Sequence, residues 1–365
     1  MKAPAVRLSS VSAGRDNNLN LMRFVAATMV ILTHAFGLTD NTAFEPFHRL
    51  FDLGGGDVGV KMFFVLSGLL VTKSWLGKRP SEFAWARCMR IYPGLWASVL
   101  ITVLLAGLFF STVPTLTFWS SRETLAYIGH NFFVLPHFGA RLDLPHAFTA
   151  EGREFNVSLW TLPLEIEMYL MLALVGVLLG VRARYVAALA LLGAGMVIVA
   201  HLTHSSDAML ASRGRFLYFF FCGSLAYMLR ERILLSTLGA AALFAGLIGV
   251  GLLSGSFPVR QAALALALPY LLLWSAYIPR GFIRNWNRLG DYSYGLYIYS
   301  VPIQTAVAAL GIGSTPLKNF WISMPIALAF ATASWHLLEQ RALHRPLPRW
   351  LARLQIQTPL LARSP

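Results

Sequence analysis

The sequence predicts an all-α, polytopic transmembrane helix bundle of about ten spans, with both termini in the cytosol. Of the 365 residues, 56% are hydrophobic and 13% are charged, whereas a soluble domain has about 25% charged residues. Long apolar runs recur along the whole chain, and about 20 mainly apolar residues cross a bilayer as a helix. Within these runs, apolar residues follow one another and do not alternate with polar residues. The runs therefore indicate helices and not barrel strands.

The apolar runs set the predicted boundaries. A polar tail at 1–18 precedes the first span and makes a cleaved signal peptide unexpected. The transmembrane domain is expected at 19–339, and a basic cytosolic tail at 340–365. The expected spans are 19–38, 57–77, 91–112, 158–180, 185–203, 215–229, 233–253, 261–278, 292–312 and 319–338.

The distribution of basic residues predicts the orientation. With these spans, the two tails and the loops on their side hold nineteen of the 30 Lys and Arg residues, and the opposite loops and span ends hold nine. Basic residues gather on the cytoplasmic side of a membrane, so both termini are expected there. The net charge of +14 then reflects topology, and no nucleic-acid partner is expected.

Two segments differ from short connectors. Residues 113–157 form a long extracytoplasmic loop, in which the aromatic stretch from Tyr127 to Phe138 indicates an ordered or re-entrant element. The C-terminal tail carries Arg341 and three further arginines at four-residue spacing. This spacing suits a helix lying on an anionic leaflet, although a solvated basic tail explains it equally well.

Ionisable residues at membrane depth are costly and usually face a bundle interior or a wet cavity. Arg23 and His34 lie eleven residues apart in the first span, on one helix face and about 16 Å apart along the axis. Glu165 and Glu167 begin the fourth span. We expect the basic and acidic faces to meet around one polar cavity. The simpler alternatives are that Arg23 reaches the headgroups and that His34 is only an interhelical hydrogen-bond donor.

Arg87 and Arg90 lie one helical turn apart at the expected cytosolic mouth. Paired guanidinium groups bind phosphates bidentately. Membrane topology alone also accounts for many such pairs. The two cysteines, Cys88 and Cys222, indicate neither a disulfide nor a metal site.

Six segments follow one another in an order typical of one family. They are Asn20-Leu-Met-Arg23 continuing to His34, Gly59 to Gly68 with its Phe-Phe pair, Arg87-x-x-Arg90-Ile-Tyr-Pro93, Ser158-Leu-Trp160 to Glu165 and Tyr169, Tyr292-Ser-Tyr-Gly295 with its following tyrosines, and Trp335 to Glu339. Together they resemble the acyltransferase 3 family of integral membrane acyltransferases. There are departures: Ser300 stands where many members have a histidine, and Arg341 where many have a proline.

The resemblance implies an O-acyltransferase of the bacterial inner (cytoplasmic) membrane. Its donor substrate would be cytosolic acyl-CoA, with acetyl-CoA the usual choice, and no cofactor would be bound. Its acceptor would be a hydroxyl of an envelope or exported polysaccharide, free or lipid-linked, and its other partner the lipid bilayer. Arg87 and Arg90 would bind the acyl-CoA phosphates.

The same resemblance assigns His34, Arg23 and Glu165 to catalysis. His34 would be the base that activates the hydroxyl, or a transient acyl carrier. Arg23 would hold the electrostatics of the cavity or the thioester carbonyl, and Glu165 would orient a partner or bind the sugar. The alternative function is a transporter or flippase of a glycan or small solute, which a wet cavity with intramembrane charges also fits. No internal repeat supports a transporter.

Overall fold

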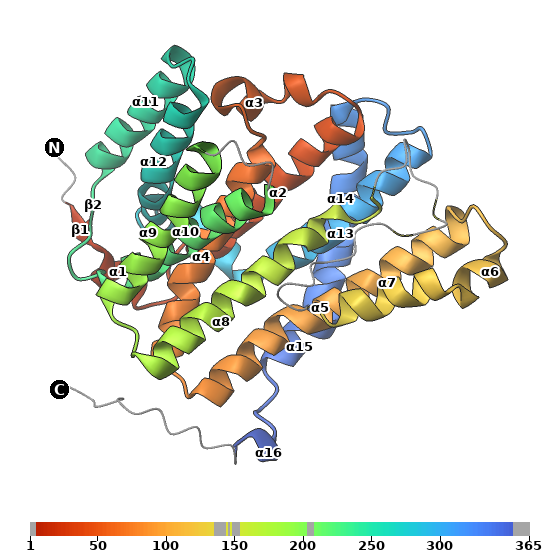
Figure 1. Ribbon diagram of the computed structural model, residues 1–365, viewed down its shortest axis with the longest axis horizontal. Helices are drawn as coiled ribbons and strands as arrows, with labels where there is room; N and C mark the ends of the chain where they lie inside the picture. The colour runs from red at the N-terminus through yellow and green to blue at the C-terminus, as the bar shows by residue number, and fades with distance from the viewer. Residues whose placement is uncertain (1–4, 135–143, 145–146, 148–153, 203–207, 353–365) are drawn as a thin grey trace.

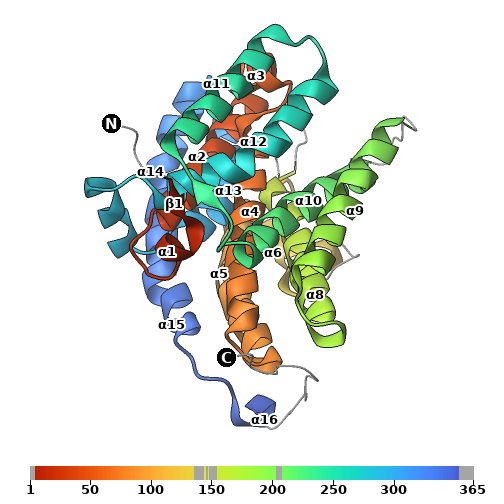
Figure 2. The ribbon, with the colours of Figure 1, turned by 90° about the vertical axis from the view of Figure 1, so that its left-hand side faces the viewer.

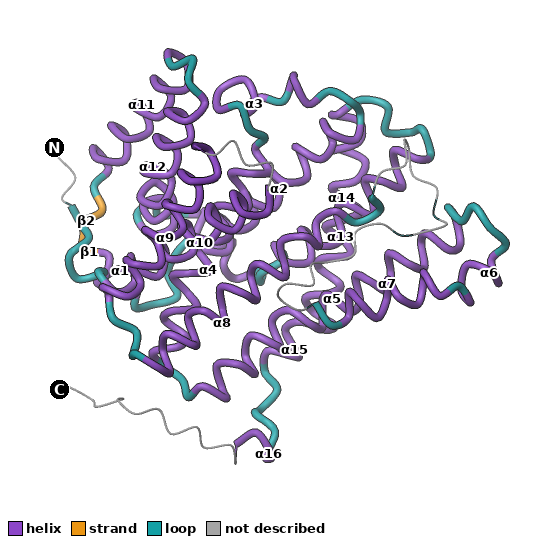
Figure 3. Tube along the Cα trace, in the orientation of Figure 1, coloured by secondary structure: helices purple, strands orange, loops and turns teal. Residues whose placement is uncertain are grey.

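The computed structural model describes residues 5–134, 144, 147, 154–202 and 208–352, and nearly all of its regular structure is helical (Figures 1 and 3). The elements, in chain order, are β1 (Val6–Arg7), α1 (Leu8–Ser12), α2 (Leu19–Leu38), a 3₁₀ turn (Thr42–Phe44), α3 (Pro46–Phe51), α4 (Gly55–Leu76), α5 (Pro80–Phe109), α6 (Thr115–Ser120), α7 (Arg122–Phe132), a 3₁₀ turn (Val157–Thr161), α8 (Leu162–Leu178), α9 (Ala183–Leu202), α10 (Ala208–Met228), β2 (Leu234–Leu235), α11 (Thr237–Leu253), α12 (Phe257–Tyr277), a 3₁₀ turn (Phe282–Arg288), α13 (Ser293–Ala309), α14 (Pro316–Ser334), a π turn (Trp335–Glu339), α15 (Gln340–Leu343) and α16 (Arg349–Ala352).

Among the described residues, seven helices are long and apolar enough to cross a membrane. They are Leu19–Leu38, Gly55–Leu76, Pro80–Phe109, Val157–Leu178, Ala183–Leu202, Phe257–Tyr277 and Pro316–Leu343. The prediction of an all-α membrane bundle is therefore confirmed. The three other expected spans coincide with α10, α11 and α13, which fall outside that set, so the total of ten stays a prediction.

Helix α4 is the most buried of the seven candidate spans. Helix α2 packs against α4, α13 and α14, while α10 packs against α4 and α9 (Figures 1 and 2). Helices α4 and α10 cross very closely. A Cβ atom on Gly68 would lie 1.8 Å from the carbonyl oxygen of Phe220, so only glycine permits this approach. Gly68 belongs to the Ser-Gly pair of the second motif.

Segments that the sequence predicts on one side of the membrane contact one another. In the N-terminal tail, Val6 pairs with Leu235 in a two-stranded sheet, and Asp16 forms an ion pair with Arg284. At the start of α5, Trp85 Nε1 donates to the carbonyl oxygen of Arg345, 3.2 Å away. These contacts group both tails at one end of the bundle. Which end faces the cytosol stays a prediction.

The expected ordered element in the long loop is helix α7, which packs along α5 (Figure 1). Tyr127 is fully buried, and Trp96 Nε1 donates to the carbonyl oxygen of Phe132, 3.0 Å away. Trp96 lies thirteen residues before the end of α5, about 20 Å along its axis. The chain therefore turns back beside α5 as an ordered helix, and its entry into the membrane stays a prediction. The remainder of the Tyr127 to Phe138 stretch, residues 135–138, lies outside the described residues.

The C-terminal tail does not form one continuous helix over its described part. Helix α15 ends at Leu343 and α16 begins at Arg349. Pro346 and Pro348 lie between them. Proline lacks a backbone N–H and disfavours helical geometry in the residue before it. The single basic face expected from the arginine spacing is therefore interrupted, and Arg353 lies outside the described residues.

Candidate active site

A cavity of about 770 Å³, which includes its part open to solvent, lies between α2, α4, α5, α8 and α13. Four of the predicted site residues line this cavity, namely Arg23, Arg87, Arg90 and Glu165. We call it the arginine cavity. Tyr169, Tyr294 and Tyr297 add aromatic surface to its wall.

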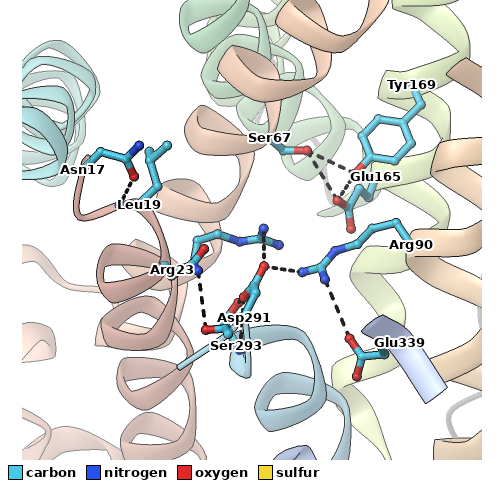
Figure 4. Close-up of polar contacts among 12 residues, drawn as sticks. Asn17, Leu19, Arg23, Ser67, Arg90, Glu165, Tyr169, Asp291, Ser293 and Glu339 are labelled. Atoms are coloured by element: carbon cyan, nitrogen blue, oxygen red, sulfur yellow. Dashed lines mark hydrogen bonds and ion pairs between the residues drawn. The ribbon is translucent and has the colours of Figure 1, made fainter. Parts of the chain in front are cut away.

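Asp291 joins two of the arginines (Figure 4). Its Oδ2 lies 2.6 Å from a guanidinium nitrogen of Arg23 and 2.7 Å from one of Arg90. Arg90 also reaches Glu339, whose Oε2 lies 3.7 Å away. All four side chains are largely buried. A buried charge requires a partner, and in this chain of two guanidinium and two carboxyl groups each group contacts at least one of the opposite kind.

The backbone brings these groups together in two ways. Gly94, one turn beyond Arg90 on α5, permits a close approach of α13: a Cβ there would lie 2.8 Å from the ring of Tyr294. The π turn at Trp335–Glu339 changes the helical register before Glu339, and single π turns often occur at functional sites. Glu339 thereby points inward, only 1% exposed, and accepts a hydrogen bond from Ser334 Oγ at 2.8 Å.

Asp291 precedes α13 and is the acid on which the network converges. Burial would raise the pKa of Asp291, but the charges of Arg23 and Arg90 and the hydrogen bonds from Ser293 lower it to about 2. The carboxylate is therefore ionised throughout the physiological pH range, and it neutralises one arginine charge.

Arg87 differs from Arg90 although it lies only one turn away. Its guanidinium group lies 5.7 Å from the ring centroid of Tyr169 and 5.9 Å from that of Phe83. Within the described part of the chain it forms no ion pair, and its buried Nε has no hydrogen-bond partner. Arg87 is therefore a cation in the cavity wall that is available to a ligand.

Glu165 also lines the cavity, together with Ser67 and Tyr169 (Figure 4). The Tyr169 hydroxyl donates to Glu165 Oε1, and Ser67 Oγ lies 3.4 Å from the same oxygen. Two donors thus hold the carboxylate at the cavity. Glu167 does not line the cavity and lies 3.6 Å from Arg213.

His34 does not line the arginine cavity. It lies in a second hollow, of about 620 Å³ including its open part, with Gly37, Leu38, Glu154, Val157 and Val301. We call this space the histidine hollow. The single cavity predicted from the shared helix face of Arg23 and His34 is thus wrong. The two residues are far enough apart along α2 for other side chains to close the space between them.

The hydrogen bonding of His34 defines its free nitrogen. Nδ1 lies 2.9 Å from the carbonyl oxygen of Val30, and because a carbonyl only accepts, Nδ1 carries the proton in the neutral ring. Nε2 then has a free lone pair, and among the described residues it has no hydrogen-bond partner. At the position of the missing late histidine, Ser300 is fully buried and donates to the carbonyl oxygen of Tyr297, 3.3 Å away.

Sequence reasoning did not assign Asp291 or Glu339 to the site. A signal was present for Asp291, which is the only acidic residue between Glu231 and Glu339 and directly precedes the fifth motif. Ser67, Tyr169 and Glu339 lie within quoted motifs but received no role. The resemblance to the family identifies the segments. Only the packing of the helices shows which of their side chains contact one another.

Comparison with known proteins settles the family. The family model described as an acyltransferase domain, Acyl_transf_3, matches residues 16–338. The chain belongs to the acyltransferase 3 family. It is therefore a multi-pass membrane acyltransferase, and the prediction from the six motifs is confirmed. Family membership also favours the acyltransferase over the transporter alternative.

Two curated proteins are similar to this family member over almost its whole length. Nodulation protein 10 of Rhizobium leguminosarum bv. viciae is 28% identical, covering 91% of this chain and 94% of that protein. An O-acetyl transferase of Shigella phage Sf6 is 25% identical, covering 92% of this chain and 98% of that protein. No solved structure matches the acyltransferase significantly.

Proposed function

We propose that this acyltransferase transfers an acetyl group from acetyl-CoA to a hydroxyl of an envelope or exported polysaccharide. The observation that supports it best is the unpaired Arg87 in a cavity whose other two arginines are held by carboxylates. A free cation in such a wall suits an anionic donor. Transfer of an acetyl group to oxygen follows the name of the similar phage protein, an O-acetyl transferase.

In this proposal Arg87 binds a phosphate of the donor. Arg presents two parallel N–H groups to a phosphate, which fixes the orientation of the ligand. Arg90 adds positive potential, but its ion pairs with Asp291 and Glu339 give it mainly a positioning role. With the predicted orientation, the arginine cavity belongs to the cytosolic half of the bundle, where CoA is present.

His34 is proposed as the general base. A sugar hydroxyl is a weak nucleophile until its proton is removed, and Nε2 of His34 has the lone pair that this step needs. As Nε2 takes the proton, the hydroxyl oxygen bonds to the carbonyl carbon of the thioester. The carbon–sulfur bond breaks, and the CoA thiolate leaves and is protonated. The histidine hollow would face the outer side, where envelope glycans are completed.

Arg23 and Glu165 would both act on the donor in the arginine cavity. A guanidinium group near the thioester stabilises the negative charge that develops on its carbonyl oxygen, which is the role proposed for Arg23. Glu165, held by Ser67 and Tyr169, would accept hydrogen bonds from the donor. Both roles require the donor to extend from Arg87 across the cavity.

The test uses purified protein in lipid nanodiscs and radiolabelled acetyl-CoA. Binding is measured by calorimetry, and acetyl transfer by incorporation of label into the glycan fraction of membranes that contain the protein. Arg87→Gln is expected to weaken binding, while Lys78→Gln, which removes an exposed charge just before α5, is the matched control. A wild-type protein that neither binds acetyl-CoA nor labels glycan overturns the proposal.

A further inference from the structure

The arginine cavity and the histidine hollow lie in series along the same elements. On α13, Tyr297 lines the cavity and Val301 lines the hollow. On the 3₁₀ turn, Thr161 lines the cavity and Val157 lines the hollow. Four residues rise about 6 Å in an α-helix and about 8 Å in a 3₁₀ helix. Only about one turn of structure therefore separates the two spaces.

Three side chains from three elements fill the boundary on the cavity side. The hydroxyls of Thr161 and Tyr297 lie 2.7 Å apart and form a hydrogen bond. The Phe63 ring, from α4, packs edge-on against the Tyr297 ring, with 5.7 Å between centroids. Thr161 and Tyr297 are only 5% and 7% exposed. The cavity and the hollow share no lining residue and are thus separate spaces in this structure.

We propose that Tyr297 and Thr161 form a partition that decides whether the acyl group goes to the acceptor hydroxyl or to water. The inference rests on the proposed function, because it takes the donor thioester to the arginine cavity and the acceptor to the histidine hollow. While the partition is closed, water in the hollow does not reach the thioester. Exclusion of water from a site is a general means of suppressing hydrolysis.

When the partition is open and no acceptor is bound, the thioester is hydrolysed. A water oxygen bonds to the thioester carbonyl carbon, the carbon–sulfur bond breaks, and acetate and the CoA thiol are the products. During productive transfer the partition must also open, and one hydrogen bond between side chains of different elements is weak enough to allow it. Its strength sets the fraction of time that the two spaces are joined.

The test removes this hydrogen bond from either side. Tyr297→Phe keeps the ring, and Thr161→Val keeps the shape of the side chain. Release of CoA thiol from acetyl-CoA, by purified protein in nanodiscs without acceptor, is expected to rise about fivefold to tenfold in each variant. Because both variants remove the same bond, the double variant is expected to show no further increase. A merely structural role predicts a lower melting temperature in each variant, with no faster release of CoA thiol.

Tyr218→Phe is the matched control, since the Tyr218 hydroxyl lies 3.3 Å from the carbonyl oxygen of Ala265 and Tyr218 lines neither space. Its release of CoA should equal that of the wild type. If the wild type transfers acetyl to glycan but neither variant releases CoA faster without acceptor, the partition is overturned. If the wild type neither binds acetyl-CoA nor labels glycan, the proposed function fails, and the partition with it.

Discussion

The arginine cavity and the histidine hollow lie about one helical turn apart, yet their charges are arranged in opposite ways. Two arginines of the cavity wall belong to a connected network with Asp291 and Glu339. This network joins α2, α5, the start of α13 and the π turn. The hollow contains one histidine and one glutamate among glycine and aliphatic residues. Buried ion networks depend on every member, whereas a histidine with a free ring nitrogen depends on few neighbours.

The cavity and the hollow should therefore respond differently to substitution. Changes in the network should reduce both the stability of the protein and the binding of the donor, because the same groups support the fold and shape the cavity. Changes in the hollow should reduce the chemistry and leave the fold intact. The following experiments test that division.

The largest effect is expected for His34→Ala. If Nε2 is the base, acetyl transfer to glycan falls by about 10²- to 10⁴-fold, while the melting temperature and the affinity for acetyl-CoA stay unchanged. His201→Ala, at the exposed end of α9, is the control and should transfer normally. Normal transfer by His34→Ala, at normal protein levels, would remove His34 from the mechanism.

Arg90→Gln should mainly reduce stability. Without its charge, Asp291 keeps Arg23 as its ion-pair partner, and Glu339 loses its ion pair. Breaking a buried pair costs about 3–5 kcal/mol. Thermal unfolding in detergent, followed by size-exclusion chromatography, should show a large decrease in melting temperature. An unchanged melting temperature would mean that the network is not important for the fold.

Arg87→Gln is the same substitution one turn away, and it should leave the melting temperature unchanged. Loss of a charge-assisted contact with phosphate is expected to weaken acetyl-CoA binding about 10- to 100-fold. Arg87→Lys keeps the charge without the planar guanidinium group. Its affinity for acetyl-CoA should lie between those of the wild type and Arg87→Gln. If Arg87→Gln destabilises the protein as strongly as Arg90→Gln, the two arginines do not differ in role.

The smallest expected effect is on the free energy of unfolding at acid pH. The folded-state pKa of Asp291 is lowered from 3.8 to about 2. Its ionised form therefore stabilises the fold above about pH 4, and this stability is lost as the pH falls through about 2. The shift corresponds to about 2 kcal/mol. Unfolding of the wild type and Asp291→Asn should differ at pH 7 and converge between about pH 4 and pH 2. A constant difference over that range would contradict the assignment.

Much of the site was accessible from the sequence because its residues belong to motifs. Arg23, Arg87, Arg90 and Glu165 were named from their segments, and they line one cavity. The contrast between Arg87 and Arg90 was not accessible, since both arginines fit one motif equally well. What separates them is a carboxylate two hundred residues away in the chain, and no local pattern indicates such a contact.

The sequence alone determined that the protein is a helical membrane acyltransferase, because apolar length and motif order are local properties of the chain. Helical periodicity placed Arg23 and His34 on one face of α2, but it could not show whether the space between them is open. Only the tertiary structure decided that, since Phe63, Thr161 and Tyr297 arrive from three separate elements. It likewise decided which charges pair, because the π turn and the close approach at Gly94 depend on how α5, α13 and α14 pack.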